Sequence, residues 1–113
     1  MKVIIAGGRM GVSYDEVVAA IKASGFEITE VVSGCAAGVD THGEQWAAEN
    51  HIPVVKFPAD WQKYDRSAGP IRNSEMAEYA DALIAIWDGG SRGTANMIGE
   101  MKAKSKAIFI KGI

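Results

Sequence analysis

Short apolar runs alternate along the chain with amphipathic segments. Each apolar run is brief enough for a buried strand, and most are followed by apolar residues recurring every three or four positions, the spacing of one helix face. The expected strands are 2–6, 26–32, 52–57, 82–87 and 106–110. The expected helices begin near Ser13, Thr41, Pro70 and Thr94. Five strands alternating with four helices predict an α/β fold, a parallel sheet with right-handed crossovers and helices on both faces.

Capping residues support two of these helix starts. Ser13 with Glu16, and Thr41 with Glu44, each match the capping box, in which a hydroxyl and a carboxylate bond backbone N–H groups at the start of a helix. Gly25 is placed to close the first helix. These patterns predict that the first two helices begin at Ser13 and Thr41.

Glycine-bearing turns follow the first, second and fourth expected strands. In a parallel sheet such turns all lie at the carboxyl edge, and ligands bind at that edge where the strand order reverses. An order of 3-2-1-4-5 places the reversal between strands one and four. We therefore expect one three-layer Rossmann-like domain over residues 1–113, with a ligand site at this edge.

The turn after the fourth strand carries the clearest chemical signal. Asp88 and two glycines separate an apolar strand from the next helix. Such a turn exposes unpaired backbone N–H groups beside the positive end of a helix, which favours an anion. Arg92 adds a forked cation there. The sequence therefore predicts a phosphate site in this turn.

The candidate ligand residues come from the three turns and from the start of the third helix, where a cation is unfavourable unless it faces an anion. They are Gly7, Gly8, Arg9, Ser33, Gly34, Gly38, Asp40, Arg72, Asn73, Asp88, Gly89, Gly90, Ser91, Arg92, Gly93 and Thr94. Structural roles compete with ligand roles for several of them. Asp40 is able to cap a helix or accept from a ribose hydroxyl, and Asp88 to hold its turn or accept from the same group. The hydroxyl of Ser33 is equally suited to contact a phosphate and to form a hydrogen bond within its own turn.

The amino-acid composition limits the kinds of binding partner that we expect for the protein. A formal net charge of -2 and a pI near 5.6 give no general attraction for a polyanion, so a small ligand is expected rather than nucleic acid. Cys35 is the only cysteine, which excludes an internal disulfide and a cysteine-cluster zinc site. No metal or cofactor is expected. No segment approaches membrane-spanning length and no signal peptide is evident, so we expect a cytoplasmic protein.

Four motifs in order give the chain a family resemblance. They are Ala6-Gly7-Gly8-Arg9, Val32-Ser33-Gly34-Cys35-Ala36-Ala37-Gly38-Val39-Asp40, Ala68-Gly69-Pro70-Ile71-Arg72-Asn73 and Gly89-Gly90-Ser91-Arg92-Gly93-Thr94. With these motifs the chain resembles the SLOG superfamily of Rossmann-like nucleotide-binding proteins, specifically its small YspA-type (cpYpsA-related) family. The resemblance implies nucleotide binding, and a homodimer is plausible by the same resemblance.

Relatives in that superfamily suggest different activities. Cytokinin-activating phosphoribohydrolases carry Gly-Gly-x-Gly-Thr-x-x-Glu and an arginine on the preceding helix; Arg72 matches that arginine, but Met97 stands at the glutamate position. A methionine is neither a base nor a nucleophile, so only Arg72, Glu100 and Asp88 remain as weak catalytic candidates. DNA-processing proteins share the pattern Ser-Gly-x-Ala-x-Gly-x-Asp found here from Ser33.

Three functional hypotheses follow. The first is recognition of a nucleotide or nucleotide derivative, with phosphate over residues 89–94, ribose near 33–40 and the base toward Trp61 or Tyr64. The second is an enzyme that cleaves an N-glycosidic bond. The third is an interaction module that keeps only the fold, for which the pocket would be collapsed.

Overall fold

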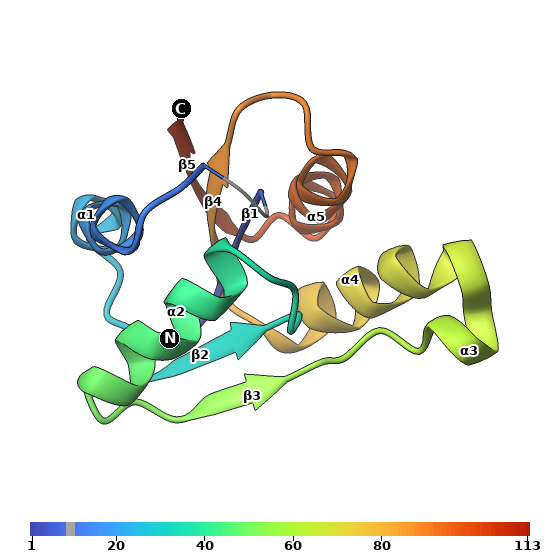
Figure 1. Cartoon of the computed structure of the whole chain (residues 1–113), viewed down its shortest axis with the longest axis horizontal. Coiled ribbons are helices and arrows are strands. Elements are labelled where there is room, and N and C mark those ends of the chain that lie inside the picture. The colour runs from blue at the N-terminus through green and yellow to red at the C-terminus, as the bar shows by residue number, and fades with distance from the viewer. Residues whose placement is uncertain (9–10) are drawn as a thin grey trace.

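Five parallel strands form a single sheet in the computed structural model, which describes residues 1–8 and 11–113 (Figure 1). The order is β3-β2-β1-β4-β5, as the sequence predicts. The strands are β1 (Lys2–Gly7), β2 (Glu30–Ser33), β3 (Val54–Lys56), β4 (Ala82–Trp87) and β5 (Ala107–Gly112). The chain has the Rossmann-like α/β architecture, and its order reverses between β1 and β4.

Helices cover both faces of this sheet. They are α1 (Tyr14–Ser24), α2 (Val39–Glu49), α3 (Trp61–Tyr64), α4 (Ala68–Tyr79) and α5 (Arg92–Ala103), with a 3-10 turn, η1 (Asp65–Ser67), before α4. Figure 1 shows α1 and α2 on one side of the sheet and α4 and α5 on the other, with α3 at the end of the molecule. None of the helices in the described part of the chain has the length and apolar character needed to cross a membrane.

Two apolar cores follow from the alternation of side chains along the central strands. Ile5 and Ile84 face α1 and α2, while Ile4 and Leu83 face α4 and α5. In β4 the burial is almost complete from Ala82 on, which explains its uninterrupted apolar sequence. The central strands are thereby fixed between two helical layers, and their carboxyl ends are held in a constant position.

Close packing at the end of β1 requires glycine. A Cβ on Gly7 would overlap the carbonyl oxygen of Ile86 on the neighbouring strand and would lie 2.8 Å from Cγ2 of Val39. The N–H of Val39 also donates to the carbonyl oxygen of Gly8 at 3.3 Å. The start of α2 is thus seated directly on the end of β1.

The predicted capping box at Thr41 is wrong for the same reason. Because Val39 is buried and its N–H bonds to Gly8, α2 begins at Val39 with Gly38 as the N-cap and no side-chain cap. The Thr41 hydroxyl donates instead to the carbonyl oxygen of Ala36 at 3.3 Å. At Ser13 the hydroxyl half of the box is confirmed, since the hydroxyl accepts from the N–H of Glu16 at 3.2 Å. The Glu16 carboxylate differs from the prediction, because its Oε1 accepts from the Ser13 hydroxyl at 3.3 Å.

Other element bounds also differ from expectation. The second strand is shorter than 26–32 because β1 begins opposite Glu30, so the preceding residues have no ladder partner. β3 is likewise limited to the three residues paired with β2. Residues 61–67, which lie between the expected strand 52–57 and the helix expected from Pro70, form α3 and η1, and α4 then begins at Ala68.

A lysine closes the far end of α4. Lys106 Nζ lies 2.6, 3.0 and 2.7 Å from the carbonyl oxygens of Ala77, Glu78 and Ala80. These are carbonyl groups that a helix end leaves without intrahelical partners. Lys106 therefore joins α4 to the start of β5.

Candidate ligand-binding site

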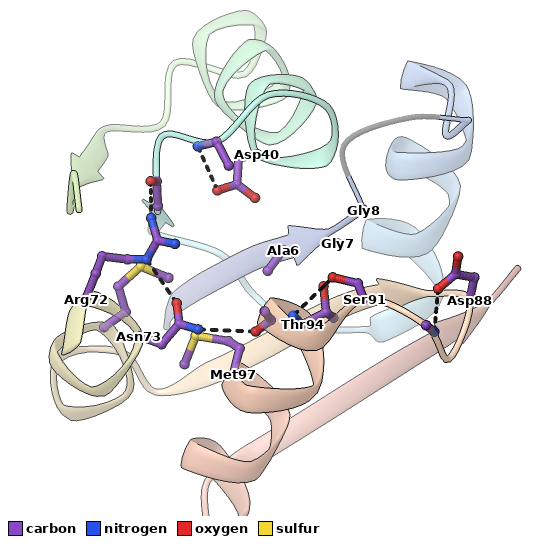
Figure 2. A pocket seen from close by; sticks show the side chains of 15 residues that line it. Ala6, Gly7, Gly8, Asp40, Arg72, Asn73, Asp88, Ser91, Thr94 and Met97 are labelled. Atoms are coloured by element: carbon purple, nitrogen blue, oxygen red, sulfur yellow. Dashed lines mark hydrogen bonds between the residues drawn. The ribbon is translucent and has the colours of Figure 1, made fainter. Parts of the chain in front are cut away.

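A pocket of about 630 Å³ opens at the carboxyl edge of the sheet, where the strand order reverses (Figure 2). Its lining comes from the ends of β1 and β4, the loop after β2, and the facing turns of α4 and α5. The lining residues are Ala6, Gly7, Gly8, Gly34, Ala36, Asp40, Arg72, Asn73, Met76, Asp88, Gly90, Ser91, Gly93, Thr94 and Met97. The volume is in the range of about 300–1,000 Å³ typical of small-molecule sites.

The β4–α5 turn is organised by its own side chains. Asp88 Oδ1 accepts from the N–H of Gly90 at 2.7 Å, and Gly89 between them has a φ of +90°. Ser91 is the N-cap of α5, and its Oγ accepts from the N–H of Thr94 at 3.3 Å and from the Thr94 hydroxyl at 3.0 Å. Asp88 thus has the structural role that the sequence left open as an alternative. The N–H groups in the first turn of α5 lie at the N-terminal end of the helix, and this is the end that attracts anions.

Arg72 and Asn73 connect the other walls of the pocket. Arg72 Nη1 donates to the carbonyl oxygen of Gly34, and Nε donates to Asn73 Oδ1 at 3.0 Å. Asn73 Nδ2 in turn donates to the carbonyl oxygen of Gly93 at 3.2 Å and to Asn96 at 2.9 Å. Figure 2 shows this chain of contacts running from the β2–α2 loop through α4 to α5. Arg72 is therefore held in a fixed orientation at the pocket wall.

Gly34 makes room for this arginine. A Cβ at that position would lie 2.8 Å from Arg72 Nη1 and 3.1 Å from Asp40 Oδ2. Any larger residue would push the guanidinium away from the loop. The glycine therefore favours the close approach of these two side chains, and no positive φ is involved.

Asp40 is a buried carboxyl group in the pocket wall. It is 7% exposed, and its Oδ2 accepts from the N–H of Ala36 at 3.2 Å. Burial raises the pKa of Asp40 to about 6, against the opposing effects of the Ala36 N–H, the charge of Arg72 and the Gly34 N–H. At neutral pH the group is therefore mainly an acceptor, and below pH 6 it becomes a donor. Helix capping does not occupy it, because α2 has no side-chain cap.

Ser33 lies beneath the β2–α2 loop and outside the pocket lining. Its hydroxyl donates to Glu44 Oε2 at 2.6 Å and accepts from the N–H of Cys35 at 3.1 Å. Of the two roles predicted for Ser33, the structure therefore shows the bond to its own turn. Cys35 itself is an exposed residue with a φ of +63°. The partial burial of its thiol group and the negative charge of the nearby Glu44 both raise the pKa of the thiol.

Most residues predicted for the site are brought together, and four are not. Outside the lining lie Ser33, Gly38, Gly89 and Arg92. Arg92 begins α5 with an exposed side chain. Arg9 falls outside the described residues.

The ligand residues predicted from the sequence do not include the apolar part of the lining, namely Ala6, Ala36, Met76 and Met97. Both methionines lie on the inward faces of their helices. Their spacing in the sequence predicts core residues, and it therefore gives no sign that they lie at the floor of the pocket. Met97, 1% exposed, lines the pocket at the position where the phosphoribohydrolase motif has glutamate. Glu100 is half-buried on α5 and is not among the lining residues.

The charge of the site is nearly balanced. Arg72 is the one cation among the described lining residues, and Asp40 and Asp88 are the acids. Over residues 1–8 and 11–113, no group of three or more histidine, cysteine or acidic side chains is placed to hold a metal ion. The arrangement provides backbone N–H donors, one fixed guanidinium and one buried carboxyl group, which suits a ligand with both an anionic group and hydroxyls.

Comparison with known proteins relates the chain to a family and to one solved fold. The model of the family described as YAcAr, YspA, cpYpsA-related SLOG family, matches residues 1–64. No curated protein matches significantly. The X-ray structure of DNA processing protein A (DprA) from Streptococcus pneumoniae is similar, with a TM-score of 0.79 and 18% identity over 96% of this chain and 49% of that one. The chain thus spans about half the length of DprA, and at this identity the likeness concerns the fold alone.

Proposed function

The chain belongs to the YspA, cpYpsA-related SLOG family, and from this premise we propose that it binds a nucleotide or nucleotide-derived ligand at the carboxyl edge of its sheet. The supporting observation is that three glycine-bearing turns line one pocket together with Arg72. Arg72 and the β4–α5 turn lie beyond the residues that match the family model, so their part in the proposal rests on geometry. The proposed role is recognition, with the ligand released unchanged.

The phosphate is assigned to the β4–α5 turn. Gly90, Ser91 and Gly93 line the pocket at the start of α5, where backbone N–H groups and the helix dipole both favour an anion. With Asp88 engaged by Gly90, the turn keeps its shape before the ligand arrives. Such preorganisation reduces the entropy lost on binding.

The sugar is assigned to the neighbourhood of Asp40. This carboxyl group lines the pocket and accepts from the N–H of Ala36, and a carboxylate has acceptor sites beyond one such bond for a hydroxyl. Among the described lining residues Arg72 is the one cation and Asp40 and Asp88 are acids, so the charge of the site favours a ligand with one phosphate over a ligand with three. We therefore expect nucleoside monophosphates to bind more tightly than triphosphates.

Two glycines of α5 provide a matched test. Gly93 lines the pocket and Gly99 does not, and a Cβ on either would meet no atom within 4 Å. Alanine at either position should maintain or raise helix stability, by up to about 1 kcal/mol. Gly93→Ala places a methyl group against the phosphate, so we expect its Kd for adenosine 5′-monophosphate to rise about tenfold, the loss of one hydrogen bond to a charged group. Gly99→Ala should bind like the wild type.

Isothermal titration calorimetry with a panel of nucleoside mono-, di- and triphosphates measures these affinities. Selective weakening by Gly93→Ala supports the proposal. Equal affinities for the two variants would place the ligand elsewhere, and no binding across the panel would refute the proposed function.

One observation favours a second candidate, cleavage of an N-glycosidic bond. A buried carboxyl group with a pKa of about 6, lying in a pocket beside an arginine, is suited to proton transfer near neutral pH. Incubation with nucleoside monophosphates followed by chromatography distinguishes the two functions. Release of free base by the wild type and its loss in Asp40→Asn would establish the enzyme, whereas intact ligand at high protein concentration supports recognition alone.

A further inference from the structure

A second cavity adjoins the pocket beyond the contact between Arg72 and Gly34. Its volume is about 320 Å³, and its lining comprises Gly34, Cys35, Ala36, Ala37, Pro58, Ala59, Trp61 and Arg72. Gly34, Ala36 and Arg72 line both cavities. The β2–α2 loop and the Arg72 side chain thus line both spaces, so a ligand that lies over them would reach into both.

Trp61 is the one large side chain in the lining of this second cavity, apart from Arg72. It is 54% exposed, more than any other large apolar side chain in the described part of the chain. One edge of the ring rests on α4, since a Cβ on Gly69 would lie 3.4 Å from Trp61 Cη2. Asp60 holds the short helix α3 by accepting from the N–H of Lys63 at 3.1 Å. The indole is therefore supported at its edge and open over much of its surface.

We propose that Trp61 is the stacking platform for the base of the nucleotide. This inference rests on the proposed function: the phosphate and sugar occupy the larger pocket, and the base extends past Arg72 into the second cavity. The exposed surface of the indole borders the second cavity, and a flat ring of a ligand stacked on it would cover that surface. Arg72, fixed between the two cavities, lies beside the sugar on one side and the base on the other.

The chemistry of the second cavity also predicts weak discrimination among bases. Its described lining residues provide no carboxylate, carboxamide or hydroxyl side chain to read the edge of a base. Stacking is tolerant of base identity because every base presents a π face. We therefore expect adenosine, guanosine, cytidine and uridine monophosphates to differ from one another by less than about tenfold in Kd.

Binding of two probes to variants of Trp61 tests the inference. Adenosine 5′-monophosphate carries a base, and ribose 5-phosphate does not. Because truncating a stacking aromatic weakens binding by about 1–3 kcal/mol per base, Trp61→Ala should raise the Kd for the nucleotide about 5- to 160-fold. The Kd for ribose 5-phosphate should be unchanged. Trp61→Phe should retain most of the affinity for the nucleotide.

Tyr64→Ala is the matched control. Tyr64 lies on the same short helix and is 39% exposed, but it is not part of the lining of the second cavity. Its truncation should leave both affinities as in the wild type. Because both aromatic side chains are largely exposed, neither variant should unfold, and circular dichroism checks this.

Cys35 gives an independent readout. It is the only cysteine in the chain, it is exposed, and it lines the second cavity. Adenosine 5′-monophosphate at saturation should slow alkylation of Cys35 by iodoacetamide at least several-fold, whereas ribose 5-phosphate at saturation should not. Mass spectrometry of the intact protein measures the alkylation rate.

The outcomes separate the inference from the proposed function. If the wild type binds both probes and Trp61→Ala does not weaken nucleotide binding, the stacking role is refuted and the proposed function stands. Equal protection of Cys35 by the two probes would also refute it. If the wild type binds neither probe, the proposed function fails and the inference fails with it.

Discussion

Replacing Asp40 by asparagine removes a buried carboxyl group while keeping its shape and an oxygen acceptor for the N–H of Ala36. The native pKa of Asp40 is about 6, against an ordinary value of 3.8. At about 1.4 kcal/mol for each pKa unit, the difference corresponds to about 3 kcal/mol of stability. The cause is burial, which outweighs the attraction of Arg72 and the backbone N–H groups.

The sign of the effect follows from proton binding. Between about pH 4 and 6 the folded wild type holds a proton on Asp40 that the unfolded chain has lost, so its stability falls as the pH rises. Asp40→Asn lacks this contribution, and other titrating groups largely cancel when the two proteins are compared. The free energy of unfolding of the variant minus that of the wild type should therefore increase by about 2 kcal/mol from pH 4 to pH 7, because at pH 4 the unfolded chain still holds part of the proton.

Urea unfolding at pH 4, 5, 6, 7 and 8, followed by tryptophan fluorescence, measures this difference. Asp88→Asn is the control, because it removes an exposed carboxylate at the rim of the same pocket, where burial contributes no penalty. A flat difference for Asp40→Asn would show that the attraction of Arg72 and the backbone N–H groups cancels the effect of burial. A difference that decreases with pH would show that this attraction dominates over burial.

The closure of α4 and the fit of Arg72 yield two further predictions. Lys106→Met should lower the free energy of unfolding by about 2 kcal/mol, because three carbonyl oxygens lose a charged donor. Lys104→Met is the control, since it breaks a surface ion pair 3.0 Å long, and it should lower the free energy of unfolding by less than about 1 kcal/mol. Equal losses in urea unfolding would contradict this. Gly34→Ala should displace the flexible end of Arg72, from which its methyl would lie 2.8 Å, at a cost of about 0.5–1.5 kcal/mol for the hydrogen bond to the Gly34 carbonyl oxygen. We also expect weaker nucleotide binding by calorimetry; unchanged affinity would show that the position of Arg72 is unimportant.

The fold could be predicted from the sequence because every strand is a separate apolar run and every crossover is long enough for a helix. The bounds that were wrong depend on contacts between distant segments. α2 begins early because Val39 packs on the end of β1, and β2 is short because β1 begins opposite Glu30. A capping pattern at Thr41 carries no information about either contact.

The site was predictable to a similar degree. The three turns could be identified because the turns that follow parallel strands all lie at the carboxyl edge of the sheet. Arg72 and Asn73 lie among these turns because the start of α4 faces the same edge. The direction of a side chain on its helix is not encoded in a motif, which is why Arg92 is outside the lining while Met97 is part of it. The raised pKa of Asp40 depends on its burial, which only the packed structure reveals.

Nuclear magnetic resonance titration of the ¹⁵N-labelled protein with adenosine 5′-monophosphate tests the central claim most directly, and a chain of 113 residues is well suited to it. We predict saturable shifts of backbone amide signals concentrated at Gly7, Gly34, Gly90 and Gly93, the residues of the three turns around the pocket. An absence of saturable shifts, or shifts centred on another surface of the molecule, would contradict the claim that these turns bind a nucleotide.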